Sequence, residues 1–499
     1  MSNIETRKSY KARIGIYSAG LKTYWQQFEG LEKRLTDYGK FIEKKIAEVA
    51  EVYNYGMVDN ATDARSAGEW FNKQNVDLVF CHCATYVTSD SVLPIHQICQ
   101  APLVILNLQP AARIDYDRTN TGEWLAHCAA CAIPEIANAL QRANIEYNII
   151  NGLLGLDYTP EISMTDENTA QRPEAIRAWK EINEWIKAAE VVRTLRNSRF
   201  GFLGNTYSGM LDMYSDFTML QAQTGLHIEV LEMCDLNEQL EMVTDEEILA
   251  KRKEIEDTFI ISGDSPSDSR IKKPTEQQMQ WSSKVSAALD RFADKYNLDA
   301  ITYYYHSVDG NAYEDLQGGT IVGYSLLTAK GIPCAGEGDL KTALAMKICD
   351  VLGKGGSFSE IVVTDYEDGT ILIGHDGPFH IEIANSQPIL RGMGVYHGKK
   401  GTGISVEAKV KSGPITTLNV TQTNKGQLKL IISEADATNG KIMTIGNTQT
   451  PVKFKYDPDT YMDKWFAEAP THHCALSMGH NASLFKKVGT LLHIETVVL

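Results

Sequence analysis

Residues 13–17 read Arg-Ile-Gly-Ile-Tyr, a short apolar run that ends in Ser18-Ala19-Gly20. Stretches with the composition of helices, such as residues 41–49, separate this run from later ones of the same kind. Apolar strands that alternate with helices are typical of a parallel sheet with helices on both faces. The first part of the chain is therefore predicted to be an α/β domain. The later apolar runs are residues 76–80, 103–106 and 146–150.

A second α/β region is predicted to follow a long helix. Pro173 suits the first turn of a helix that continues to about Leu195. The apolar run at residues 200–203 then opens a new unit, so we place a boundary near Asn197. Thr244 and Thr275 each begin a capping-box pattern, which predicts helices after them.

The character of the sequence changes after about Lys330. One more helix is expected at residues 341–352, with Gly353 as its C-terminal cap. Short alternating runs separated by turn residues then predict an antiparallel β domain. The predicted domains are residues 1–196, 197–330 and 331–499. The short runs are residues 361–364, 370–373, 381–383, 405–410, 416–420 and 428–432.

Composition and charge restrict the classes of partner. The chain of 499 residues carries a net charge of −16, which repels nucleic acid and anionic membranes. We find no apolar run of the roughly 18 residues that a membrane helix needs. The first thirteen residues have no hydrophobic signal core, so we expect a cytoplasmic protein with no nucleic-acid or membrane partner.

Nine cysteines are spread through the chain. Cys81-His82-Cys83 and Cys128-Ala129-Ala130-Cys131 raise the possibility of zinc, but a structural zinc site needs four converging ligands. The first pair ends an apolar strand and the second lies in an alanine-rich stretch of helical character. We therefore expect reduced cysteines in the core. Nucleotide binding is not supported, because neither α/β region contains G-x-G-x-x-G or a Walker A motif.

The last third of the chain holds the candidate site. Glu337 stands between two glycines just before a helix, and Glu360 follows a Gly-Gly-Ser-Phe-Ser turn. His375 follows a strand, and His472-His473 follow Pro470-Thr471. Carboxylates and imidazoles together suit a divalent metal of intermediate hardness and also supply acid–base groups. The alternatives are that Glu337 is a capping or surface residue and that the His pair is polar surface.

These residues make the chain similar to a known family. The segment Ala335-Gly336-Glu337-Gly338-Asp339-x-Lys341-Thr342-Ala343 resembles the glutamate motif of the bacterial L-arabinose isomerases. Ser357 to Glu360 resembles the segment of the second glutamate in that family, and Gly374-His375 its first histidine. Thr471-His472-His473 resembles its late His-His pair, and Tyr313-Glu314-Asp315-Leu316 an aromatic-Glu-Asp-Leu turn.

The resemblance implies two Rossmann-like doubly wound domains followed by a β-rich, antiparallel barrel-like domain. It also implies an aldose–ketose sugar isomerase that uses Mn²⁺, or another divalent metal such as Co²⁺. Carried over by the matching motifs, the metal ligands would be Glu337, Glu360, His375 and His473. The active site of the family lies between subunits of a trimer-based hexamer, which implies a homo-oligomer here.

The sequence departs from the family on the sugar side. The N-terminal Gln-His-Leu-Tyr-Gly segment of the family is replaced by residues 18–25, which include Tyr24. The first histidine is followed by Asp376-Gly377-Pro378 rather than by an apolar Met-Leu pair. Gln109 and His127 occupy places that resemble sugar-side residues, although a strand-end amide and a helix histidine explain them equally well. The sugar specificity is therefore open.

An aldose–ketose isomerase moves a proton between adjacent carbons through an enediol. Glu337 and Glu360 are the acid–base candidates, because both would border the metal and the sugar. The alternatives are an isomerase for another sugar, such as a fucose-type deoxyhexose, and a non-catalytic sugar-binding or regulatory protein.

Overall fold

The computed structural model of the protein describes residues 9–158, 168–265, 267–305, 310–393, 395–396, 399–400 and 403–499. Internal contacts divide the chain into two compact units. Residues 10–193 form one unit, and residues 194–499 form the main part of the other. Among the described helices, none has the length and the apolar character needed to cross a membrane. The predicted limits of three domains stay a prediction.

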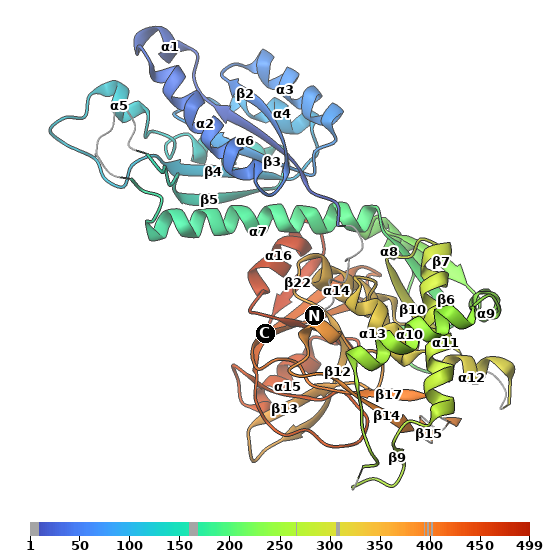
Figure 1. The fold of residues 1–499 in the computed structure, drawn as a ribbon. Helices are drawn as coiled ribbons and strands as arrows, with labels where there is room; N and C mark the ends of the chain where they lie inside the picture. The colour runs from blue at the N-terminus through green and yellow to red at the C-terminus, as the bar shows by residue number, and fades with distance from the viewer. Residues whose placement is uncertain are drawn as a thin grey trace. The chain divides into compact units, whose positions relative to one another are not determined.

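The unit of residues 10–193 is built on a parallel five-stranded sheet in the order β2-β1-β3-β4-β5 (Figure 1). Alternate residues of β1 point to opposite faces: Tyr17 and Ala19 pack with helices α3, α4 and α6, whereas Ser18 faces α2. The helices therefore cover both faces. The strands are β1 (Arg13–Ala19), β2 (Glu51–Val58), β3 (Leu78–Cys83), β4 (Leu103–Gln109) and β5 (Tyr147–Leu153).

The helices of this unit begin where the sequence supplies caps. The Asn60 side chain accepts hydrogen bonds from the first turn of α3, and Asn120 does the same for α5. Pro173 begins α7, the long helix that the sequence predicted. The helices are α1 (Thr23–Gln27), α2 (Leu31–Ala47), α3 (Ala61–Gln74), α4 (Leu93–Ile98), α5 (Thr121–Leu125), α6 (Ile133–Arg142) and α7 (Pro173–Arg196).

A second parallel sheet, in the order β11-β10-β6-β7, opens the unit of residues 194–499. Its strands are β6 (Arg199–Gly204), β7 (His227–Leu231), β10 (Ala300–Tyr304) and β11 (Cys334–Ala335). Both predicted capping boxes are present, at Thr244 before α10 and at Thr275 before α11. The helices are α8 (Phe217–Thr224), α9 (Met233–Glu241), α10 (Asp245–Thr258), α11 (Glu276–Lys295), α12 (Ala312–Gly318), α13 (Ile321–Ala329) and α14 (Leu340–Val351).

Seven of the later strands form a mainly antiparallel, barrel-like sheet in the order β18-β21-β12-β13-β20-β19-β22. Pairing of β18 with β19 closes this sheet into a ring, to which β22 adds in parallel. Helix α14 packs on β18, β21 and β12 and also on β10 and β11, so it joins the second parallel sheet to the barrel. The strands are β12 (Ser357–Asp365), β13 (Thr370–Gly374), β18 (Gly413–Gln422), β19 (Leu428–Ala437), β20 (Thr450–Phe454), β21 (His473–Met478) and β22 (Glu495–Val498).

Smaller elements complete this unit. Strand β14 pairs with β17 and also with the short strands β8 and β9, which come earlier in the chain. Helices α15 and α16 flank the barrel strands in sequence. These elements are β8 (Ile260–Ile261), β9 (Ile271–Lys272), β14 (Ile389–Met393), β15 (Val395–Tyr396), β16 (Lys399–Lys400), β17 (Ile404–Glu407), α15 (Pro458–Ala467) and α16 (Ala482–Leu491).

The predicted fold class is confirmed: two parallel α/β cores precede a β-rich, barrel-like region. One predicted strand is wrong, because Ile381–Ile383 forms a 3₁₀ turn in which only Ile383 is buried. The alternation Ile381-Glu382-Ile383 is typical of a strand, but this segment is only three residues long and buries Ile383 from a 3₁₀ turn. The expected burial of the cysteines is also wrong in part. Cys81 and Cys83 are buried, whereas Cys131 is exposed and Cys128 partly exposed.

Candidate metal centre

Glu337 is presented by an unusual piece of backbone. It follows β11 and adopts φ 60°, the left-handed region that non-glycine residues seldom occupy. The next residue, Gly338, also has positive φ, and a Cβ there would lie 2.3 Å from the carbonyl oxygen of Asn205. The backbone N–H of Tyr207 donates to the Glu337 carbonyl at 2.9 Å. Strain of this kind concentrates at functional sites, because the surrounding structure must hold it in place.

Strand register brings the other candidate residues together. Glu360 on β12 lies opposite His473 on β21 and opposite Gly374 on β13, so His375 follows at the end of the neighbouring strand. Phe358, two residues before Glu360 on the same face of β12, packs its ring against both imidazoles at centroid distances of 4.5 Å and 4.4 Å. Residues more than 100 positions apart in sequence are thus neighbours in the barrel.

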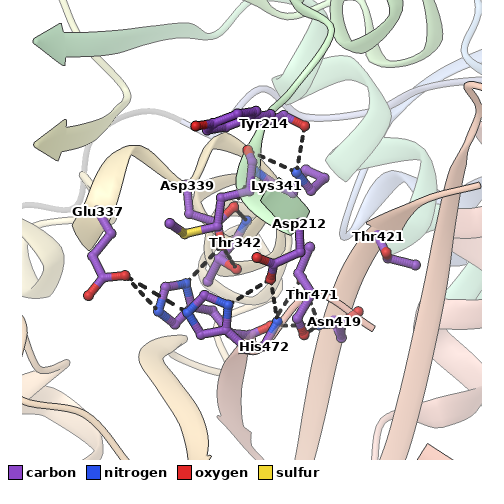
Figure 2. Close-up of polar contacts among 12 residues, drawn as sticks. Asp212, Tyr214, Glu337, Asp339, Lys341, Thr342, Asn419, Thr421, Thr471 and His472 are labelled. Atoms are coloured by element: carbon purple, nitrogen blue, oxygen red, sulfur yellow. Dashed lines mark hydrogen bonds and ion pairs between the residues drawn. The ribbon is translucent and has the colours of Figure 1, made fainter. Parts of the chain in front are cut away.

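Two overlapping groups of side chains can hold a metal ion. One consists of Glu337, His472 and His473, and the other of Glu360, His375 and His473; in each group the ligand atoms all lie within 4.8 Å of one another. The two groups share His473 and contain all four predicted ligands. The Glu337 carboxylate lies 3.6 Å from His473 Nε2, 3.8 Å from His472 Nε2 and 3.9 Å from His375 Nε2. Figure 2 shows Glu337 facing His472 across this cluster.

Two polar atoms of the cluster are buried without a hydrogen-bond partner among the described residues. They are His473 Nε2 and Glu337 Oε2, which face each other. A buried polar atom left without a partner costs about 1–3 kcal/mol. A divalent cation would satisfy both atoms at once, and mixed carboxylate and imidazole ligands suit first-row metals such as Mn²⁺ and Co²⁺. The residues present therefore fit the metal that the motifs imply.

Asp339 orients His473. Its Oδ2 lies 3.0 Å from His473 Nδ1, and both side chains are fully buried. With Nδ1 donating to this carboxylate, Nε2 is left as a lone-pair donor toward the cluster. Burial opposes ionisation of Asp339, but its contact with His473 holds the pKa of Asp339 well below its usual value. Burial also lowers the pKa of His473, which favours the neutral imidazole that binds metals.

The cap of helix α14 is Asp339 and not Glu337. Oδ1 of Asp339 accepts from the backbone N–H groups of Lys341 and Thr342, both at 3.0 Å. The alternative that Glu337 merely caps this helix is therefore wrong. The sequence signal for Asp339 was present, since an aspartate directly before a helix is a favoured cap, but its second role as a partner of His473 needs the fold.

His375 has its own carboxylate neighbour. Asp376 Oδ1 lies 2.8 Å from His375 Nδ1, and the backbone N–H of Gly377 donates to the same Nδ1 at 2.9 Å. Burial would lower the pKa of His375, but Asp376 raises it above its usual value. The other ring nitrogen of His375, Nε2, lies 3.9 Å from Glu337 Oε1.

His472 is placed differently from His473. Its Nδ1 lies 2.6 Å from Asp212 Oδ2, which also accepts the His472 backbone N–H at 3.0 Å. Burial would lower the pKa of His472, but Glu337 and Asp212 raise it to about 9. In return the imidazoles of His472 and His473 lower the pKa of Glu337 against the effect of burial. His472 is thus a charge partner for Glu337 in this arrangement, and His473 is the better ligand.

A buried lysine supports the segment that carries Asp212. Lys341 Nζ donates to the Met213 carbonyl and to Ser215 Oγ, both at 3.1 Å. Lys341 is completely buried, so these bonds replace the solvation of its ammonium group. No spacing in the sequence links Asp212 to the His-His pair, and Lys341 stands in the glutamate motif without a signal for this supporting role.

The residues predicted for the sugar side belong to the other compact unit. The Gln109 amide at the end of β4 donates to the His127 carbonyl at 3.1 Å, so the fold does bring this pair together. His127 Nδ1 lies 2.8 Å from the Glu123 carbonyl, and its Nε2 is buried without a hydrogen-bond partner in the described part of the chain. Tyr24 on α1 packs edge-on against Phe28. Sugar binding by Gln109, His127 and Tyr24 stays a prediction.

Comparison with known proteins agrees with these motifs. Residues 215–355 match the family model described as the L-arabinose isomerase central domain. An L-arabinose isomerase of Bacillus subtilis (strain 168) is 22% identical over 372 residues, which cover 73% of this chain and 71% of the relative. The corresponding enzyme of Enterobacter sp. (strain 638) is 22% identical, covering 65% of this chain and 64% of the relative. That of Shewanella baltica (strain OS223) is 25% identical, covering 37% and 35%.

The matched central segment contains Glu337 and Asp339 together with the helix that Asp339 caps. The resemblance seen in the motifs is therefore confirmed. The chain is therefore similar to the L-arabinose isomerases, and residues 215–355 match the central domain of that family.

Proposed function

We propose that the protein is a metal-dependent aldose–ketose isomerase that converts an aldopentose to a ketopentose through an enediol. Glu337, Glu360, His375 and His473 would hold the metal, Mn²⁺ or another divalent ion such as Co²⁺. The observation that carries the proposal is the pair of buried, unpartnered atoms, His473 Nε2 and Glu337 Oε2, inside a cluster of four converging ligands. The similarity to L-arabinose isomerases supports the enzyme class, an intramolecular oxidoreductase that acts on a sugar.

When bound, a divalent cation supplies a Lewis acid that stabilises negative charge on the sugar oxygens. The protein must then move a proton between two adjacent carbons. The imidazoles around Glu337 lower its pKa, so its carboxylate is ionised and able to accept a proton. Glu360 lies across the cluster and is the second acid–base group in this proposal. The buried ring of Phe358 packs against both His375 and His473 and gives this side of the cluster an apolar wall.

The further properties are proposals of the same kind. We infer a small sugar as substrate, a homo-oligomer built on trimers, and a cytoplasmic location. An isomerase for a fucose-type deoxyhexose remains an alternative, because the N-terminal segment differs from the family pattern at residues 18–25. A non-catalytic sugar-binding protein is disfavoured, since binding alone does not require four converging metal ligands.

The test is a screen of aldopentoses and aldohexoses for ketose formation with full-length, Mn²⁺-supplemented protein. We expect turnover of at least one aldose, loss of turnover after chelation, and recovery with Mn²⁺ or Co²⁺. The exposed Glu367 provides a control, since Glu367→Gln removes a carboxylate outside the cluster. Full turnover by thoroughly chelated protein would contradict metal dependence, and a metal-loaded protein that converts no aldose would favour the binding protein.

A further inference from the structure

The turn between α5 and α6 carries two cysteines that the proposed isomerase chemistry does not use. Cys128 and Cys131 place their sulfurs 3.0 Å apart, and Cys131 Sγ also lies 3.0 Å from the Cys128 carbonyl oxygen. Cys131 is exposed and Cys128 is partly exposed. This surface position separates the pair from the buried cysteines of the core, such as Cys81 and Cys83.

Three side chains hold the backbone of this turn. Thr85 Oγ1 donates to the Leu125 carbonyl at 2.7 Å, the Gln109 amide donates to the His127 carbonyl at 3.1 Å, and Cys83 Sγ lies 3.6 Å from the Ala129 carbonyl. All three donors come from the ends of β3 and β4 or from the residues just after them. The two thiols are therefore held as neighbours by the sheet itself. A reaction between groups already held together avoids most of the entropic cost of bringing them together.

The environments of the two thiols differ. Burial, with a contribution from Cys131, raises the pKa of Cys128 to about 12. A thiolate is the form that attacks a disulfide, and accessibility decides which thiol meets a reagent first. The exposed Cys131 is thus placed to react first, with Cys128 directly behind it to complete the exchange.

We propose that Cys128 and Cys131 form a dithiol site that is converted reversibly into an intramolecular disulfide by a low-molecular-weight disulfide. The Cys131 thiolate attacks one sulfur of the reagent and displaces the first thiolate. Cys128 then loses its proton and attacks the Cys131 sulfur, which releases the second thiolate. One S–S bond forms in the protein, the reagent disulfide is reduced to two thiols, and these take up the two protons that the cysteines lose.

The disulfide would be readily reduced again. It closes a ring across only two intervening residues and lies at the surface, and exposed or constrained disulfides are the labile ones. The bond would also fix the turn that carries His127. Cys128 and Cys131 belong to the unit of residues 10–193 and are not among the residues of the Glu337–His473 cluster, so this proposal does not depend on the isomerase proposal.

The test treats reduced, full-length protein with oxidised glutathione and counts reactive thiols without denaturation. Only Cys128, Cys131 and Cys234 are exposed or partly exposed among the nine cysteines. We expect Cys128 and Cys131 to disappear together, with no glutathione retained on either and a peptide mass lower by two hydrogen atoms. Dithiothreitol should restore both thiols. In Cys128→Ser, Cys131 should instead keep a bound glutathione, whereas the matched surface variant Cys234→Ser should form the disulfide normally.

A second reagent tests whether the two thiols are adjacent without oxidising them. Phenylarsine oxide binds two thiols that are held side by side. We therefore expect it to protect Cys128 and Cys131 of the wild type from reaction with maleimide. In Cys128→Ser and Cys131→Ser, the one remaining thiol should stay reactive. Wild-type protein that retains glutathione on Cys131 would overturn the proposal, as would failure of phenylarsine oxide to protect the pair.

Discussion

The two compact units use buried histidines in opposite ways. In residues 194–499, His473 donates through Nδ1 to Asp339 and turns its Nε2 toward other potential ligands. In residues 10–193, His127 also leaves Nε2 without a partner, but Gln109 contacts its backbone carbonyl and the nearby carboxylate of Glu123 is paired with Arg34. Both histidines leave Nε2 unpartnered, but the groups that could hold a metal ion in the described residues include His473 and not His127.

The largest expected effect concerns the two glutamates of the cluster. Glu337→Gln and Glu360→Gln keep the side-chain shape but remove the proton acceptor and one negative charge. Since general acid–base catalysis contributes about 10²–10⁴-fold, we expect kcat to fall at least about 10²-fold in each variant. Steady-state kinetics with metal occupancy measured in parallel checks this. Near-normal turnover at full occupancy would remove that glutamate from the catalytic role.

Metal affinity should separate the two adjacent histidines. His473 is fully buried and aims Nε2 at the cluster, whereas His472 is paired with Asp212 and partly exposed. We expect His473→Ala to weaken Mn²⁺ binding more than His472→Ala does. Equilibrium metal binding to both purified variants gives the comparison, and equal losses would mean that His472 is a ligand as well.

A smaller loss is expected for Asp339→Asn. The amide can still accept a hydrogen bond for the helix cap, but it no longer supplies the charge that orients His473. Partners that orient metal ligands are typically worth 10–100-fold in affinity or activity. We expect a loss in that range at nearly unchanged melting temperature. A large fall in melting temperature with unchanged metal affinity would assign Asp339 to the helix alone.

The smallest effect belongs to the other unit. If Gln109 binds sugar, Gln109→Ala should raise KM with little change in kcat, whereas a purely structural amide would affect stability alone. Loss of one hydrogen bond to a backbone carbonyl costs about 0.5–1.5 kcal/mol. Kinetics and thermal unfolding of the same variant distinguish the two, and an unchanged KM would remove Gln109 from the sugar side.

Much of the fold followed from local pattern. The apolar runs predicted both parallel sheets, and Thr244 and Thr275 marked the starts of their helices correctly. The strand predicted at residues 381–383 failed because a short alternating run does not distinguish a strand from a 3₁₀ turn. The cysteines of the Cys-x-x-Cys segment were assigned to the core, since alanine-rich sequence does not reveal a surface turn.

The candidate site divides in the same way. Motifs pointed to Glu337, Glu360, His375 and His473, but only pairing of β12 with β21 and β13 brings the last three together. Asp212 carries no local signal, because its partner His472 lies 260 residues later in the chain. Contacts of that sequence separation depend on the barrel being formed, so neither periodicity nor capping rules could supply them.

Direct titration of metal-free, full-length protein with Mn²⁺ tests the central claim most closely. Calorimetry, or the loss of the free Mn²⁺ signal in electron paramagnetic resonance, should show saturable binding of one ion per chain in the wild type. Binding should be lost or greatly weakened in His473→Ala and retained in Glu367→Gln. Absence of saturable binding in the wild type, or equal binding in His473→Ala, would contradict the metal centre at Glu337, Glu360, His375 and His473.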